Sequence, residues 1–79
     1  MTRKFSADLT LGALLKNARK ECRITLEQAA GISGTTKGYI YNLENGFRGN
    51  PSLKMSYQLA MTYDISLEDM ARAAYIGDK

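Results

Sequence analysis

The fold of this chain is decided by the stretch TLEQAAGISGTTKGYIYNLENG, residues 25–46. Thr25 can cap a helix over residues 26–33, and Gln28 stands three residues later, as a capping box requires. Gly34 follows where the chain must turn, because glycine adopts positive φ at little cost. The first half of the stretch therefore predicts a short helix that ends in a tight turn.

The second half of the stretch predicts another short helix, over residues 37–45. Thr36 is its natural N-cap, Ile40 and Leu43 point inward three residues apart, and Gly46 can end it. The remaining side chains give this helix a polar and aromatic outer face. Two short helices in this order can place the second one in the major groove of DNA.

Three further helices are predicted outside this unit, because apolar residues recur at helical rather than alternating spacing. We expect them over residues 11–22, 52–63 and 67–75. Their expected inward residues are Leu11, Leu15, Ala18, Cys22, Leu53, Leu59, Ala60, Tyr63, Leu67, Met70 and Ala74. The prediction is one compact all-α domain of five helices over residues 1–79, with an N-terminal arm (1–9) and a frayed tail (76–79).

Composition narrows the class of protein. A chain of 79 residues makes one domain, and its one Cys allows no intrachain disulfide. No apolar run approaches the roughly 18 residues of a membrane span, and no signal peptide is recognisable. We therefore expect a cytoplasmic protein that does not bind membranes.

The net charge of +3 is unevenly distributed along the chain. Residues 1–54 hold nine Lys and Arg against four Asp and Glu, whereas residues 55–79 hold two against four. A basic front and an acidic end suit a polyanionic partner on one side of the molecule.

Enzyme and metal chemistry find no support in the residue types. The sequence contains no His, and one Cys cannot make a structural zinc site. Lys37 lies between Thr36 and Gly38, whereas a phosphate-binding P-loop needs Gly before its Lys and Ser or Thr after it. We expect no enzyme activity, cofactor, metal ion or small-molecule ligand.

The motifs together resemble the Xre/Cro-type helix-turn-helix family, which includes the lambdoid phage repressors and Cro proteins. The resemblance covers about residues 11–70 and rests on TLEQxA at 25–30, Gly34, KGYIxxLExG at 37–46, NPSL at 50–53 and ISLED at 65–69. It implies a lambda-repressor-like fold and a transcriptional regulator that binds double-stranded DNA in a sequence-specific way.

The resemblance also assigns roles to individual residues. It implies contacts to base edges from Lys37, Gly38, Tyr41 and Asn42, and contacts to the DNA backbone from Thr25, Thr36, Tyr39 and Asn45. Further phosphate candidates are the basic residues Arg48, Lys54, Arg3 and Lys4. Arg19 and Glu44 match a pair that joins the first and third helices in this family.

The chemistry of these side chains agrees with such roles. Lys37 can donate to guanine, and Asn42 can pair bidentately with adenine. Tyr39 and Tyr41 can pack on a thymine methyl group, donate to phosphate, or form a protein-binding patch. Gly38 allows close approach to DNA, or reflects drift at a tolerant position.

Apolar residues of the last two predicted helices can form a dimer seam, although some of them must belong to the core. The candidates are Met55, Met61, Tyr75 and Ile76. The leading hypothesis is a repressor that binds an operator as a homodimer, in phage lysogeny or restriction-modification control. The alternatives are a protein-interaction module on the same scaffold and an antitoxin-type autoregulator.

Overall fold

The computed structural model describes residues 10–77, with side chains through Tyr75. Its helices are α1 (Leu11–Glu21), α2 (Leu26–Ser33), α3 (Lys37–Glu44), α4 (Leu53–Tyr63) and α5 (Leu67–Gly77). The predicted all-α, five-helix architecture is confirmed. The predicted helix boundaries differ by at most two residues, and α5 runs through positions 76 and 77 of the expected tail. Arg3, Lys4 and the rest of the predicted arm lie outside the described residues.

Hydroxyl side chains begin all five helices. The side-chain oxygens of Thr10, Thr25, Thr36, Ser52 and Ser66 each accept a hydrogen bond from the backbone N–H three residues later, at 3.0–3.3 Å. Each such cap satisfies one otherwise unpaired donor and is worth about 1 kcal/mol. The caps explain why the helix starts were predictable.

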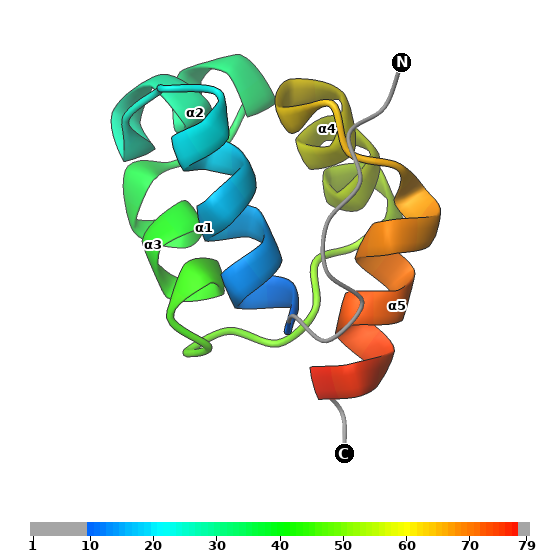
Figure 1. Cartoon of the computed structure of the whole chain (residues 1–79). Helices are drawn as coiled ribbons and strands as arrows, with labels where there is room; N and C mark the ends of the chain where they lie inside the picture. Colours follow the sequence, from blue (N-terminus) through cyan, green and yellow to red (C-terminus); the bar gives the residue numbers. More distant parts are fainter. Residues whose placement is uncertain (1–9, 78–79) are drawn as a thin grey trace.

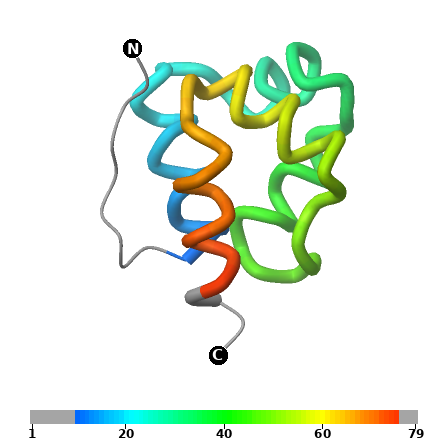
Figure 2. Tube along the Cα trace, turned by 90° about the vertical axis from the view of Figure 1, so that its right-hand side faces the viewer, coloured from blue at the N-terminus to red at the C-terminus, as the bar shows by residue number. Residues whose placement is uncertain are grey.

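Helix α1 is the centre of the packing. In Figure 1 it runs between α3 on one side and α5 on the other, and Figure 2 shows α4 beside α5. Helix α4 also packs against α2. The shared core consists of Leu11, Leu14, Leu15, Ala18, Ala29, Ala30, Ile40, Leu43, Leu59, Ala60, Tyr63, Ile65, Met70 and Ala73. None of the described helices is long and apolar enough to span a bilayer.

Several expected inward positions are wrong. Leu53 is 89% exposed and Leu67 is also exposed, because each is the first residue of its helix and lies beyond the edge of the core. Cys22 and Ala74 are half-buried, whereas Leu14 and Ala73 are buried although neither was expected inside.

The four candidates for the dimer seam differ in their exposure. Met55 is half-buried and packs against the core. Met61 and Tyr75 are exposed. The side chain of Ile76 lies outside the described residues.

Tyr63 gives the fold an expected pH dependence. It is fully buried, and this desolvation raises the pKa of its hydroxyl above the ordinary value of 10.0. The folded chain therefore keeps a proton that the unfolded chain loses, so the free energy of unfolding falls as pH rises above about 10, by at most about 1.4 kcal/mol per pH unit. The loss continues until the pH passes the higher pKa of the folded state.

Denaturant titrations from about pH 8 to pH 11 measure this loss. We expect Tyr63→Phe to lose less stability than the parent chain over this interval, because the variant carries no ionisable group at the site. Parallel losses in the two proteins would contradict this explanation.

Candidate nucleic-acid interface

Hydrogen bonds define both ends of α2, and those at its C-terminal end hold the turn toward α3. The capping box at the start of α2 is complete: the Thr25 N–H donates to Gln28 Oε1 at 2.8 Å, and the Gln28 N–H donates to Thr25 Oγ1 at 3.0 Å. At the other end, Gly34 adopts φ 79° and ψ 31°, and its N–H and that of Thr35 donate to the Ala30 carbonyl. A residue with a side chain would be strained at Gly34. The turn therefore fixes the direction in which α3 leaves α2.

The outer face of α3 carries four of the predicted contact residues. Lys37, Gly38 and Tyr41 are exposed, and Asn42 is half-buried. A Cβ atom added at Gly38 would meet nothing within 4 Å. Packing within the described part of the chain therefore gives no reason for a glycine there, and these residues leave space beside it for a binding partner.

Two aromatic side chains of α3 contact the loop that follows it. The Arg48 guanidinium lies 5.0 Å from the centre of the Tyr39 ring, within the range of a cation–π interaction. The Tyr41 ring lies 6.5 Å from that of Phe47, at 49°. Tyr39 is half-buried against the core, so it is less accessible than the sequence suggested, whereas Tyr41 is 49% exposed.

The polar residues that were predicted to contact the DNA backbone already make hydrogen bonds at the ends of their own helices. Thr25 and Thr36 use their hydroxyl oxygens as N-caps, but each hydroxyl group keeps a proton that can be donated to phosphate. The side-chain amide of Asn45 donates to the Tyr41 carbonyl at 2.8 Å. Asn45 is therefore first of all a C-cap of α3, and it is exposed at the end of that helix.

Arg19 and Glu44 form an ion pair between α1 and α3. Arg19 Nε and Nη2 donate to the two Glu44 carboxylate oxygens at 2.7 and 3.1 Å, and Nη1 donates to the Ile24 carbonyl at 3.0 Å. The side chains are only 13% and 3% exposed. The hydrogen bond to Glu44 raises the pKa of the Arg19 guanidinium above its ordinary value. The pair anchors α3 from behind while its outer face stays open.

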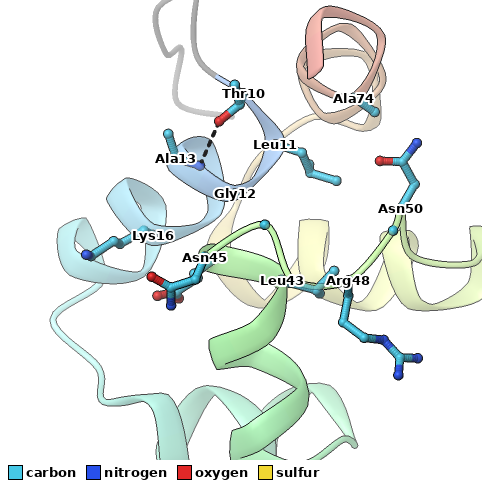
Figure 3. A pocket seen from close by; sticks show the side chains of 13 residues that line it. Thr10, Leu11, Gly12, Ala13, Lys16, Leu43, Asn45, Arg48, Asn50 and Ala74 are labelled. Atoms are coloured by element: carbon cyan, nitrogen blue, oxygen red, sulfur yellow. Dashed lines mark hydrogen bonds between the residues drawn. The ribbon is translucent and has the colours of Figure 1, made fainter. Parts of the chain in front are cut away.

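An open pocket lies where the end of α3 meets the start of α1 and the loop toward α4 (Figure 3). Its charged lining residues are Lys16, Glu44 and Arg48. Figure 3 shows the Lys16 and Arg48 side chains extending away from each other on either side of Asn45. Among the described residues that line the pocket, Glu44 supplies the carboxylate, and Arg19 holds it in an ion pair. The pocket lining places two cationic side chains, Lys16 and Arg48, beside α3.

Three residues of this region were missed by the sequence reasoning. Lys16 flanks the end of α3, and Phe47, which is 72% exposed, lies against Tyr41. Gly12 lies directly against the α3 backbone. The sequence offered one indication of a role for Phe47, namely that it is an aromatic residue in the loop after α3. Among the described residues, no group of three or more His, Cys, Asp or Glu could hold a metal ion.

Comparisons with known proteins agree with this geometry. The chain is 35% identical over 66 residues to the HTH-type transcriptional regulator DdrOP3 of Deinococcus deserti; the match covers 82% of this chain and 50% of the relative. The chain thus spans about half the length of this curated relative.

Two solved structures are similar over most of the chain. The restriction-modification controller protein C.AhdI from Aeromonas hydrophila matches with a TM-score of 0.71 and 27% identity, over 84% of this chain and 98% of that one. The clp gene regulator ClgR from C. glutamicum matches with a TM-score of 0.72 over 96% and 97%, and its 24% identity shows a shared fold alone. A family model described as helix-turn-helix matches residues 15–70, and the chain therefore belongs to the Xre/Cro-like helix-turn-helix family.

Proposed function

We propose that this chain is a sequence-specific transcriptional regulator that binds double-stranded DNA with α3 in the major groove. The observation that carries the proposal is the outer face of α3, where Lys37, Gly38 and Tyr41 are exposed while the opposite face is fixed to α1. Membership of a family of transcriptional regulators supports it.

Each residue of this face has a role that its chemistry allows. Lys37, at the first turn of α3, donates to guanine O6 or N7, and Gly38 lets the helix approach the base edges. Tyr41 packs on a thymine methyl group, and Asn42 pairs with adenine. Asn42 must turn outward to do so, because it is half-buried in the free chain.

Backbone contacts set the affinity of the complex rather than its specificity. We assign them to Thr25, Thr36, Arg48 and Lys54 in the described part, together with the arm residues Arg3 and Lys4. Tyr39 contributes by holding Arg48, and Asn45 by ending α3 next to the phosphates.

We further propose that the chain acts in the cytoplasm as a repressor and as a homodimer. Two copies on half-sites about 34 Å apart bind more tightly than one, because the second contact is intramolecular. An operator that overlaps a promoter is then closed to the polymerase. Transcription from the promoter in the presence and absence of the protein tests the sign of regulation.

The DNA contacts are tested by titrating the site that the full chain enriches from random duplexes. We expect Lys37→Ala and Asn42→Ala each to weaken binding by about 1–3 kcal/mol and to relax one position of the site. Arg72→Ala on α5 is the matched control for loss of a cation, and it should leave both affinity and specificity unchanged.

Salt dependence provides the second test. Because phosphate contacts release counterions, log K should fall steeply with log salt, and Arg48→Ala should reduce that slope by about 1. No DNA binding at low salt would overturn the proposal and would favour a protein-interaction module instead. Unchanged affinity in both α3 variants would overturn the assigned base contacts.

A further inference from the structure

An exposed aromatic side chain lies directly beyond the end of α3 and has no role in the contacts proposed above. Phe47 is 72% exposed, and its ring lies against that of Tyr41, which is 49% exposed on the outer face of α3. The two rings form one apolar surface, which we call the Tyr41–Phe47 pair. Exposed apolar groups that adjoin each other are candidates for an interaction site.

Backbone hydrogen bonds fix the position of Phe47 relative to α3. Gly46 adopts φ 76°, and its N–H donates to the Leu43 carbonyl at 3.4 Å. The Phe47 N–H donates to the Asn42 carbonyl at 2.9 Å. These two bonds are those of a Schellman motif, which ends a helix at a glycine of positive φ. Phe47 therefore stands at a defined place, where its ring extends the outer face of α3 beyond the last helical residue.

A structural role accounts for only part of the Phe47 ring. In a Schellman motif, the residue after the glycine commonly makes an apolar contact with the last turns of the helix, and the contact with Tyr41 is of this kind. This contact nevertheless leaves most of Phe47 and about half of Tyr41 exposed. A partner that covers both rings would bury apolar surface that the fold leaves in water.

The charged groups beside the pair favour DNA as that partner. Arg48 follows Phe47 directly, and its guanidinium is held 5.0 Å from the centre of the Tyr39 ring. Glu44, the one acidic residue of α3, is 3% exposed and paired with Arg19. The pair is thus bordered by an accessible cation, while the carboxylate of the same helix is buried. This combination suits a polyanion that also presents apolar groups.

We propose that the Tyr41–Phe47 pair recognises thymine methyl groups, and that Phe47 is a specificity-determining residue of the DNA interface. The C5-methyl of thymine is the apolar group that base pairs present in the major groove. Gly38, three residues before Tyr41, has no side chain that would hold α3 away from the base edges. The assignment rests on the proposed function, because it requires α3 in the major groove.

Deoxyuridine in place of thymine tests the methyl contact, because it removes the methyl group and keeps the hydrogen-bonding groups of the base. Each thymine of the site that the full chain enriches from random duplexes is replaced in turn, and binding is titrated at one fixed salt concentration. We expect binding to weaken about fourfold at one thymine or more, the factor for one buried methylene group. Equal affinity for all duplexes, or an enriched site without thymine, would overturn the assignment and leave DNA binding itself established.

Phe47→Ala separates recognition of the methyl group from support of the helix end. In this variant we expect the penalty for uracil to disappear at one position, because the ring that covered the methyl group is gone. Phe47→Leu keeps an apolar side chain and should retain most of the penalty. A purely structural Phe47 would instead weaken binding to the thymine and uracil duplexes by the same factor, and that result would overturn the assignment.

Ile32→Ala is the matched control for loss of an exposed apolar side chain. Ile32 is 65% exposed at the end of α2, where it lines a shallow groove with residues of α4. We expect this variant to keep the parent's penalty for uracil, and circular dichroism checks that every variant retains the fold. Failure of the parent chain to bind any duplex at low salt would defeat the proposed function and the assignment together. DNA binding with a uracil penalty that Phe47→Ala leaves unchanged would defeat the assignment alone.

Discussion

Replacing Glu44 by Gln is expected to destabilise the fold by about 3–5 kcal/mol, because it leaves the Arg19 guanidinium charged and without its carboxylate in a nearly buried position. Small domains are typically stable by only 5–15 kcal/mol, so this loss is a large fraction of the total. Denaturant unfolding at neutral pH measures it. Because the pair joins α1 to the last residue of α3, we also expect weaker DNA binding under conditions that leave the variant partly unfolded.

The exposed pair on α5 provides the control for Glu44. Glu68 lies 3.6 Å from Arg72, and both side chains are largely exposed. Glu68→Gln should cost no more than about 0.5 kcal/mol, because solvent screens the charges. Equal costs for the two Gln variants would show that burial does not strengthen the Arg19–Glu44 contact.

A double replacement separates the cost of an unpaired charge from the worth of the pair. Arg19→Met combined with Glu44→Leu removes both charges and keeps apolar volume between α1 and α3. We expect it to recover most of the stability that Glu44→Gln loses, since apolar replacement of a buried pair is often neutral. A loss equal to that of Glu44→Gln would point instead to the hydrogen bond from Arg19 to the Ile24 carbonyl.

The helices could be predicted because the residues that begin them form a recognisable pattern in the local sequence. A hydroxyl residue followed by an apolar helical pattern is visible at Thr10, Thr25, Thr36, Ser52 and Ser66, and each of them is an N-cap in the structure. The turn at Gly34 is equally local, because it requires positive φ. At Asp64 a non-glycine residue adopts φ 57° at the end of α4, which the sequence pattern did not reveal.

Burial was less predictable than the helices, because periodicity gives an angle around a helix but not the position of its end in the core. Leu53 and Leu67 have the right spacing and are nevertheless exposed at the first turn of α4 and α5. Met55, one of the candidates for the dimer seam, packs against the core. Such errors arise where a helix enters or leaves the packed layer.

The candidate interface was predictable in its residues but not in its contacts. The outward positions Lys37, Gly38 and Tyr41 follow from the inward positions on the same helix. The contacts of Tyr39 with Arg48 and of Tyr41 with Phe47 depend on how the following loop folds back, and no helical pattern describes that loop.

Gly12 illustrates a constraint that only tertiary structure reveals. A Cβ atom at this position would lie 2.6 Å from the Glu44 carbonyl oxygen and 2.8 Å from that of Leu43, both backbone atoms at the end of α3. Replacing glycine by alanine within a helix normally stabilises it by roughly 0.5–1 kcal/mol. Here the steric overlap determines the sign of the change in stability, because backbone atoms cannot move aside as a flexible side chain can.

We expect Gly12→Ala to destabilise the fold by about 3 kcal/mol, at the upper end of the cost of overpacking, since α1 and α3 must separate to admit the methyl group. Thermal or denaturant unfolding measures the change. Gly31 in α2 is the matched control: a Cβ atom there meets nothing within 4 Å, so Gly31→Ala should be stabilising. A stabilising effect at both positions would mean that α1 and α3 are not held at this distance. Loss at Gly12 with gain at Gly31 would show that close backbone contact, rather than helix propensity, requires a glycine behind α3.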